Sequence, residues 1–412
     1  MSIASLLDTD LYKLTMQACV HKHYKDAKVE YHLYNRSKHC HFTSEAVNWV
    51  QEQVNSWKGL TYTPDELAYL REELSYLPDA FFDFLEHDFK LDPENEVDIT
   101  FNGGSDLHIT IRGAWDTTIW YEVPVLSTVS EAYFRFVDTD WNMEGQKELI
   151  EKKGKELIAG KCMFSEFGTR RRRSLETQSL VVKTLTEVCK STPYFTGTSN
   201  VHFARLNNVK PIGTVAHELM MGVAAYTKDY ANANSRSMND WLDTVGNDHA
   251  GVALTDTFGT PIYLKIFKPP YSDIYGGVRQ DSGDPTQFTK LISQHYSSLG
   301  VKPHTKRIIF SDALNVDKCV ALKKVAIDNG LIPAFGIGTF FTNDFVSATD
   351  GKTKSHPLNI VIKIAKVNGT PAIKLSDNFG KHTGDPEEVK RAEAAVHYSE
   401  LAPEIDENRR CG

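Results

Sequence analysis

The sequence between Gly277 and Pro285 reads GVRQDSGDP, and it lies between an apolar run that ends at Tyr275 and a helical pattern. This order places Arg279 and Asp281 at the junction where a strand ends and a helix begins. Phosphate groups bind at such junctions, and the carboxylates suit a metal ion or a developing positive charge. The last five residues also fit an ordinary turn that caps a helix. This stretch alone therefore leaves both interpretations open.

The same order of elements recurs through the middle of the chain, where a short apolar strand, a polar turn and an amphipathic helix follow one another. The expected strands cover residues 209–213, 251–254, 276–279, 307–310 and 332–335. Strands that alternate with helices predict a parallel sheet. The polar residues after the strands then share one face of a (β/α) barrel, or the switch point of a doubly wound sheet. The repeat alone does not distinguish these two folds.

Both ends of the chain follow a different pattern. Residues 25–135 mix helical stretches with alternating strands such as Leu107–Arg112, and residues 359–375 predict a hairpin around Asn368-Gly369. We therefore expect the two ends to form one α+β domain, with the barrel inserted between them. The expected domains are 1–135 together with 350–412, and 136–349.

The bulk composition is ordinary for a soluble globular protein of two or three domains. The 412 residues include 41% hydrophobic and 24% charged residues, with a net charge of -8, which argues against a general nucleic-acid binder. No apolar run is long enough to predict a membrane span, and residues 1–13 lack a signal-peptide core. The six cysteines are scattered, without a Cys-x-x-Cys pair. This spacing favours reduced thiols in the cytoplasm or nucleus over a zinc site or a disulfide framework.

Four consecutive arginines, Arg170 to Arg173, precede a helix that is expected to begin at Ser174. Cations at a helix N-terminus oppose the helix dipole, so an anionic partner would stabilise them. We expect at least one of them to bind a phosphate or carboxylate through its guanidinium group. Because neighbours on a helix diverge by about 100°, the four cannot all face one pocket. The alternative is a solvated charge run or a nuclear import signal.

His217 follows an expected strand and begins a helix, and Glu218 stands beside it. A histidine in this place can be a general base, a metal ligand or a cap, but no second histidine stands at ligand spacing. Glu218 is expected to orient or polarise the ring. Asp256 and Asp312 are strand-end carboxylates that serve either as helix caps or, with Arg279, as part of one polar face.

A small phosphate cradle is expected where Gly336-Ile337-Gly338-Thr339 follows the last strand, because its backbone N–H groups and hydroxyl are free to bind an anion. Glycine-rich turns are common, so this pattern alone is weak. Tyr12 and Phe167 stand among polar residues, and core packing is the first interpretation of each.

Taken together, these segments resemble the nicotinate phosphoribosyltransferase family, and its fungal members most closely. The resemblance runs from about residue 5 to residue 390 in family order. The matching segments are Leu7–Lys13, Phe164–Arg172, Gly197–Asn200, Pro211–Glu218, Leu254–Thr260, Arg279–Pro285, Phe335–Thr339 and Lys374–Asn378.

The resemblance implies a type II phosphoribosyltransferase fold, in which an irregular, TIM-like α/β barrel is joined to a domain built from both chain ends. It also implies that nicotinate and 5-phosphoribosyl 1-diphosphate react to give nicotinate mononucleotide and diphosphate in the Preiss-Handler route of NAD salvage. ATP hydrolysis drives the reaction through a phosphohistidine, and Mg²⁺ enters with the substrate diphosphate instead of on protein ligands. The family further implies a homodimer with shared active sites, and no nucleic-acid or membrane partner.

The resemblance also assigns roles to particular residues. The family's phosphohistidine maps to His217, and the chemistry of the residues suits Asp256 and Asp281 to hold the ribose and stabilise its developing positive charge. Phe167 and Tyr12 stack on the pyridine ring, with Tyr12 supplied by the neighbouring subunit. The family's nicotinate contacts also map to Thr214 and Arg279, and its phosphoribosyl contact maps to Thr339. Residue chemistry adds Arg170 and Ser199 to the expected nicotinate site, and Asp312, Gly336 and Gly338 to the expected phosphate site.

Ser199 carries the expected substrate preference. The related nicotinamide enzyme has an aspartate at this place, which accepts a hydrogen bond from an amide and repels a carboxylate, so serine favours the acid. Use of nicotinamide by the same fold is the nearest alternative. A noncatalytic nucleic-acid or importin-binding protein and an unrelated phosphate-binding barrel enzyme are the others, and neither explains the ordered motifs.

Overall fold

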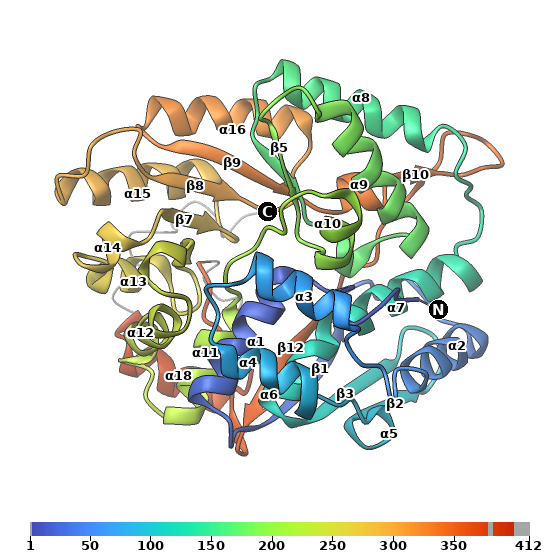
Figure 1. The fold of residues 1–412 in the computed structure, drawn as a ribbon, viewed down its shortest axis with the longest axis horizontal. Coiled ribbons are helices and arrows are strands. Elements are labelled where there is room, and N and C mark those ends of the chain that lie inside the picture. Colours follow the sequence, from blue (N-terminus) through green and yellow to red (C-terminus); the bar gives the residue numbers. More distant parts are fainter. Residues whose placement is uncertain (1, 378–381, 399–412) are drawn as a thin grey trace.

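The protein contains two large sheets surrounded by helices (Figure 1), in a computed structural model that describes residues 2–377 and 382–398. Asn378 and Cys411 lie outside the described residues. The other five cysteines are all free and buried.

The larger sheet has six strands in the order β5-β4-β9-β8-β7-β6, and every pairing within it is parallel. Helices α8, α9, α15 and α16 lie around this sheet in the upper half of Figure 1. The strands are β4 (Phe164–Glu166), β5 (Phe195–Thr198), β6 (Val252–Leu254), β7 (Gly277–Gln280), β8 (Arg307–Phe310) and β9 (Ile332–Ile337).

Four of the five strands expected from the repeat are confirmed as β6, β7, β8 and β9. The fifth prediction, residues 209–213, is wrong as a strand, because only an isolated parallel bridge joins Pro211 to Thr198. The sequence pattern also missed β4 and β5. β4 reads FSE and β5 reads FTGT, so neither is the apolar run on which the prediction depended, and tertiary pairing defines them.

The helices that follow the strands begin where their caps predict. Asp284 caps α15 (Pro285–Ser298) by accepting hydrogen bonds from the backbone N–H groups of Thr286 and Gln287 at 2.9 and 2.8 Å. Pro285 occupies the first turn, where its missing N–H costs nothing. Ser174 caps α9 (Leu175–Cys189) in the same way. The turn-and-cap interpretation of residues 281–285 is therefore correct, and it coexists with the site described below.

The second sheet joins the two ends of the chain. Its order is β13-β12-β1-β3-β2, and all its pairings are antiparallel. The predicted hairpin is confirmed, since β12 (Ile360–Val367) pairs with β13 (Thr370–Pro371) and both Asn368 and Gly369 have positive φ. The other strands are β1 (Lys28–Asn35), β2 (Val97–Phe101) and β3 (Leu107–Ala114).

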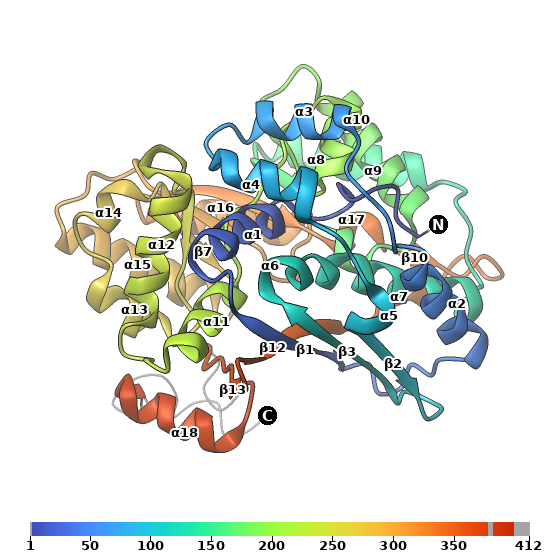
Figure 2. The same cartoon turned by 60° about the horizontal axis from the view of Figure 1, so that its bottom comes forward.

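One face of this sheet is covered by helices α1, α6 and α7 (Figure 2), and α11 packs against β12. Isoleucines 360, 362 and 364 of β12 are buried and alternate with less buried neighbours, as expected for a strand with one face in the core. The N-terminal segment reaches the edge of the parallel sheet just after β5, where Asp10 bridges to Asn200 and the N–H of Leu11 donates to the Ser199 carbonyl at 2.8 Å.

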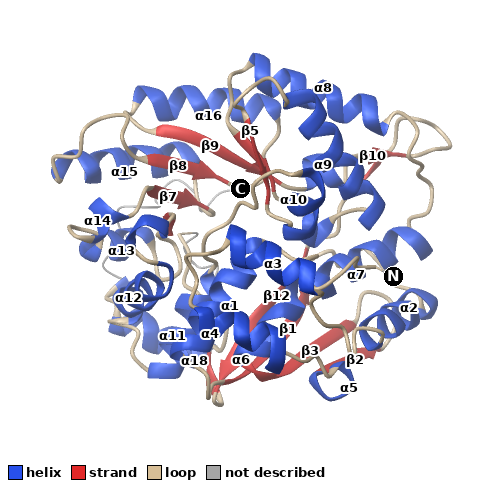
Figure 3. Ribbon diagram, in the orientation of Figure 1, coloured by secondary structure: helices blue, strands red, loops and turns tan. Residues whose placement is uncertain are grey.

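Helices make up most of the remaining described chain (Figure 3). Within the described ranges, none of them is both long enough and apolar enough to cross a membrane. A short hairpin of β10 (Phe345–Val346) and β11 (Lys354–Ser355) lies outside both sheets. The remaining α-helices are α1 (Leu11–His23), α2 (Ser44–Asn55), α3 (Pro64–Glu73), α4 (Asp79–Asp83), α5 (Pro93–Glu96), α6 (Trp115–Thr118), α7 (Glu122–Phe136), α8 (Gln146–Ala159), α10 (Val201–Asn207), α11 (His217–Thr227), α12 (Ala233–Val245), α13 (Thr260–Ile266), α14 (Tyr271–Ile274), α16 (Val316–Asp328), α17 (Thr339–Thr342) and α18 (Pro386–Ala395).

Candidate active site

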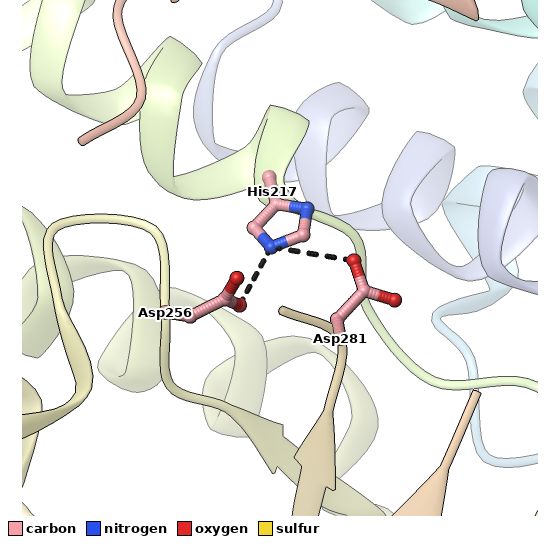
Figure 4. Close-up of side chains that lie close together, drawn as sticks. All are labelled: His217, Asp256 and Asp281. Atoms are coloured by element: carbon pink, nitrogen blue, oxygen red, sulfur yellow. Dashed lines mark hydrogen bonds and ion pairs between the residues drawn. The ribbon is translucent and has the colours of Figure 1, made fainter. Parts of the chain in front are cut away.

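Three predicted site residues meet at the carboxyl ends of β6 and β7. His217, at the start of α11, directs its Nε2 atom toward both Asp256 and Asp281 (Figure 4). Nε2 lies 2.7 Å from Asp256 Oδ1 and 3.7 Å from Asp281 Oδ2. The two aspartates follow neighbouring parallel strands, so the sheet itself sets their separation.

Arg279 and Asp281 form an ion pair at the end of β7. The Nη2 atom of Arg279 lies 2.5 Å from Asp281 Oδ1, and its Nε donates to Ser311 Oγ at 3.0 Å. Both side chains of the pair keep about a fifth of their surface exposed. The segment from Gly277 to Pro285 thus contributes a cation and an anion to one partly open place.

The charges of this centre depend on one another. Burial lowers the pKa of the His217 imidazole, Asp256 opposes that change and Lys374 adds to it. Burial alone would raise the pKa of Asp281, but Arg279 and His217 hold it below its ordinary value. The same holds for Asp256, whose pKa is lowered by His217 and Lys374 against the effect of burial. Both carboxylates are therefore ionised at neutral pH beside a largely neutral imidazole.

Sequence reasoning missed Lys374 as a site residue. Its Nζ atom lies 2.9 Å from His217 Nε2 and 2.8 Å from Asp256 Oδ2. Its neighbours in the sequence, Ile373 and Leu375, are fully buried. The sequence did contain a signal for this residue, since Lys374 stands between two apolar residues and lysine is rarely buried without a specific partner.

The three ligand atoms of His217, Asp256 and Asp281 lie within 4.8 Å of one another, which is close enough to hold a metal ion. However, the Lys374 ammonium group contacts two of the three residues. A cation placed among them would meet this positive charge at short range. The donor set therefore fits a resident metal poorly.

A second group of predicted residues gathers around Glu122 of α7. The hydroxyl of Tyr12 donates to Glu122 Oε2 at 3.4 Å, and Arg170 Nη1 lies 3.7 Å from Glu122 Oε1. Arg170 also interacts electrostatically with Asp281, so this group adjoins the centre described above. Tyr12 and Arg170 thus lie together within a single chain.

Ser199 lies beside the same group, since its backbone carbonyl accepts from the N–H of Leu11 at 2.8 Å. Its hydroxyl donates to Asp10 Oδ1 at 2.8 Å. Burial raises the pKa of Asp10, and Arg170 opposes that change. A carboxyl group is therefore present near position 199, held by the serine. Thr214 lies close by, where its carbonyl accepts from Thr15 Oγ1 at 3.2 Å.

The predicted role of Glu218 in orienting the His217 ring is wrong. Glu218 Oε1 accepts from Tyr31 OH at 2.6 Å and from Trp115 Nε1 at 3.0 Å, and Oε2 pairs with Lys13. Both carboxylate oxygens are occupied on the far side of α11. Consecutive residues at a helix start point about 100° apart, which explains why adjacency in sequence misled the prediction.

Phe167 and the glycine motif meet at the end of β9. A side chain at Gly336 would collide with the Phe167 ring, since a Cβ atom there would lie 2.3 Å from Cδ2 of that ring. Phe167 is half-buried, not part of the closed core. The glycine is thus explained by the aromatic ring that packs on it, and Gly338 and Thr339 follow at the start of α17. Phosphate binding by this motif stays a prediction.

The arginine run is not a solvated charge run. Arg172 and Arg173 are fully buried. Arg172 makes a two-bond pair with Asp8 at 2.8 and 2.9 Å, which is the anionic partner that the run required. Arg173 lies over the rings of Phe134 and Phe345, 3.7 and 4.4 Å from their centres. These two arginines stabilise the fold, and only Arg170 and Arg171 remain partly exposed.

A further group of cations lies beside the centre. Arg171 interacts electrostatically with Asp312 and with Arg36, which follows β1. Lys363 of β12 interacts with Arg36 and Lys374, and its burial beside these cations lowers the pKa of Lys363 to about 8. Arg36, Lys363 and Lys374 come from the antiparallel sheet and its flanking segments, where sequence reasoning placed no site residue. Cations crowded together in this way favour an anionic ligand with several charges.

The fold and the site define a class of protein: an α/β protein that gathers carboxylates, a histidine and cations at the carboxyl end of a parallel sheet. The nicotinate phosphoribosyltransferase (NAPRTase) family model matches residues 162–400, and the model of its N-terminal domain matches residues 7–130. The chain belongs to the nicotinate phosphoribosyltransferase family.

Individual relatives agree with this assignment. The nicotinate phosphoribosyltransferase of Saccharomyces cerevisiae is 48% identical over 411 residues, covering 97% of this chain and 96% of the relative. A probable nicotinate phosphoribosyltransferase of Schizosaccharomyces pombe is 45% identical, covering 95% and 97%. A crystal structure of a putative nicotinate phosphoribosyltransferase from Saccharomyces cerevisiae superposes with a TM-score of 0.94 at 47% identity, covering 96% of this chain and 99% of that chain.

Proposed function

We propose that the protein is a nicotinate phosphoribosyltransferase, which joins nicotinate to 5-phosphoribosyl 1-diphosphate and forms nicotinate mononucleotide and diphosphate with hydrolysis of ATP. One observation carries this proposal. In this chain, which belongs to the family, Arg279 pairs with Asp281, and the carboxylate of Asp281 lies 3.7 Å from Nε2 of His217. An anchor for an anionic ring, a carboxylate for a developing cation and a nucleophile thus adjoin one another. The names of the relatives favour nicotinate over the alternative substrate nicotinamide.

Nicotinate is a flat anion, so it requires aromatic faces and a guanidinium group. Arg279 and Arg170, which are both partly exposed, supply the charge. Tyr12 and the half-buried Phe167 supply the faces, each worth about 0.5–1.5 kcal/mol beyond burial. Thr214 adds a hydroxyl at the same edge of the sheet.

Attack of the pyridine nitrogen on the ribose C1 atom releases diphosphate and passes through a state with positive charge on the sugar. Asp281 and Asp256 suit the task of stabilising that charge, since their neighbours keep both ionised. They are fixed on neighbouring strands, so no reorganisation is needed when the charge develops.

ATP would act through His217. A largely neutral imidazole can attack the γ-phosphorus of ATP, which gives a phosphohistidine and ADP. Hydrolysis of this phosphohistidine would then be coupled to binding and release of the other substrates.

The phosphate groups require several cations. Arg36, Arg171 and Lys363 are suited to the diphosphate or triphosphate, and Asp312, Gly336, Gly338 and Thr339 to the phosphoribosyl group. Mg²⁺ would enter bound to the substrate diphosphate and neutralise its charge, which is consistent with the ammonium group that occupies the carboxylate cluster.

Formation of nicotinate mononucleotide from its two substrates, measured with and without ATP, tests this function. We expect turnover with nicotinate to exceed turnover with nicotinamide, and ATP to increase it. Acid-labile ³²P from γ-labelled ATP should appear on the protein and vanish in His217→Ala. Label that persists in this variant would remove His217 from the proposed role, and a preference for nicotinamide would overturn the substrate assignment.

We also propose a homodimer in a reducing compartment such as the cytoplasm. The resemblance supports sites completed across the dimer, although Tyr12 already lies beside Arg170 of its own chain. Mixing inactive Tyr12→Ala subunits with inactive His217→Ala subunits decides between these arrangements. Recovered activity indicates a shared site, and continued inactivity assigns Tyr12 to its own chain.

The parallel sheet is best interpreted as an irregular barrel within residues 136–349, with 1–135 and 350–412 as the second domain. Residues 211–214 would close it between β5 and β6. Two contacts support this: the Thr198–Pro211 bridge and the approach of Thr214 to Gly251, where an added Cβ would lie 2.9 Å from the threonine methyl.

A further inference from the structure

Lys374 is the charged residue nearest to His217 for which neither the motif nor the proposed reaction provides a role. Its ammonium group lies 2.9 Å from His217 Nε2 and 2.8 Å from Asp256 Oδ2. Its side chain is only 12% exposed, so water does not screen these contacts effectively.

The backbone around Lys374 is held in place from three directions. Its own N–H donates to the carbonyl of Thr383 at 3.0 Å, and the N–H of Leu375 donates to Thr257 at 2.9 Å. Asp377 accepts from both the N–H and the hydroxyl of Thr260 at 2.6 Å. The lysine is therefore tied to the loop that carries Asp256, and its short contacts follow from this anchoring.

The Nε2 atom of His217 cannot satisfy both Lys374 and Asp256 at once, because the two groups require opposite protonation states of this nitrogen. An ammonium group has only hydrogens to offer, so it requires a lone pair on Nε2, whereas the Asp256 carboxylate at 2.7 Å requires an N–H. Lys374 and Ser282 both donate to Asp256 Oδ2, at 2.8 and 2.6 Å, and this reduces the demand of the carboxylate for a proton. Protonation of the ring would also place a positive charge beside the Lys374 ammonium group, which repels it.

We infer that Lys374 is a positioning residue for His217, and that its ammonium group holds the imidazole ring in the unprotonated, nucleophilic form. This inference rests on the proposed function of His217. The other charged groups that face the ring are Asp256 and Asp281, with Arg279 paired to the latter. Among these, Lys374 is the cation in contact with the ring.

The resulting step balances without an external base. The Nε2 lone pair forms a bond to the γ-phosphorus of ATP, and the bond from that phosphorus to the bridging oxygen breaks. Its electron pair leaves on ADP, while the ring keeps its hydrogen on Nδ1. The ammonium group, released from the lone pair, then faces the oxygens of the transferred phosphoryl group.

Replacing the charge tests the inference in the full-length protein. In Lys374→Met, the titration midpoint of His217, followed by NMR of ring-labelled histidine without substrates, should rise by about 1–3 pH units. His217→Gln identifies the signal. Lys374→Arg keeps the charge and should leave the midpoint within about half a unit. Lys366→Met, which removes an exposed lysine of β12 that pairs with Glu30 of β1, is the matched control and should leave the midpoint unchanged.

Single-turnover labelling with γ-³²P ATP provides the second measurement. Because protonation removes the lone pair, the acid limb of the rate should move to higher pH in Lys374→Met by the same interval, so the rate on this limb falls while the rate at high pH is kept. Lys374→Arg should restore most of that rate.

The two measurements separate the two claims. An absence of label in the unmodified protein would overturn the phosphohistidine, while the NMR midpoint would still test the effect of Lys374 on the ring. An unmoved midpoint in Lys374→Met would overturn the inference, even if labelling is normal. If that variant does not fold, Lys374→Gln replaces it, and the same outcomes decide.

Discussion

Two arginine–aspartate pairs in this protein use the same chemistry for opposite purposes. Arg172 and Asp8 have no exposed side-chain surface, and Asn200 also donates to Asp8, at 2.7 Å. Arg279 and Asp281 keep about a fifth of their surface exposed, and Asp281 adjoins His217. Most hydrogen-bonding groups of the first pair already have partners inside the protein, whereas the second pair reaches solvent and can still bind a ligand. The degree of saturation, more than the residue types, separates a pair that stabilises the fold from one that we propose binds substrate.

The largest expected effect is on folding, in Asp8→Ala. This variant leaves the Arg172 cation buried without its carboxylate, which should cost about 3–5 kcal/mol in the free energy of unfolding. Urea denaturation of the purified variant measures this loss. The double variant Asp8→Ala with Arg172→Met should recover part of it, because no unpaired charge remains. A loss below 1 kcal/mol in the single variant would contradict the distinction between the pairs.

The second effect should appear in binding. Arg279→Ala should raise the KM for nicotinate about 10- to 100-fold, the effect of losing a charge-assisted hydrogen bond. Its free energy of unfolding should fall by less than that of Asp8→Ala, since about a fifth of each side chain in this pair reaches solvent. Steady-state kinetics and urea denaturation of the same preparation test both statements. An unchanged KM would remove Arg279 from the nicotinate site.

A smaller effect is expected at Glu122, which connects the exposed end of the arginine run to Tyr12. Glu122→Gln keeps the shape but loses the charge that faces Arg170 and Lys13. We expect a three- to tenfold rise in the KM for nicotinate, equivalent to about 1 kcal/mol, with little change in kcat. Glu73→Gln, which alters the partner of the exposed Lys210, is the control. Equal effects of the two substitutions would contradict the role of Glu122.

The smallest effect concerns pH. Arg172 holds the pKa of Asp8 below its ordinary value although burial alone would raise it. The stability from this pair is therefore present above the unfolded-state pKa, near 4, and is lost as the pH falls toward the folded-state pKa. Below about pH 4, the unmodified protein should lose up to about 1.4 kcal/mol per pH unit more than Asp8→Asn. Parallel slopes in urea titrations between pH 5 and 3 would contradict this.

Much of the parallel sheet could be predicted from the sequence, because its strands are apolar runs closed by turn residues and capped helices. The positions of Arg279, Asp281 and Asp256 at one edge followed from that repeat, whereas His217 was placed after residues 209–213, which form no strand, and only its helix start was predicted correctly. β4 and β5 could not be predicted, since their sequences, FSE and FTGT, are not apolar runs and the strands form through pairing with their neighbours.

The partners of charged side chains were the least predictable feature. Glu218 stands next to His217 in the sequence but faces Lys13, and Lys374 is 157 positions away but touches the ring. Local sequence fixes helix starts through caps, whereas these contacts depend on how distant segments pack. Arg172 and Arg173 show the same limit, since only their burial reveals that they are structural.

The pairing of β1 with β12 has a consequence for protein synthesis. β1 has β3 on one side, and its other side is completed only when β12, which ends at Val367, has been made. At about 5–20 residues per second, translation leaves that hydrogen-bonding edge of the nascent chain open for tens of seconds. Unpaired edges attract other strands, so newly made chains should depend on chaperones until the last tenth of the sequence emerges.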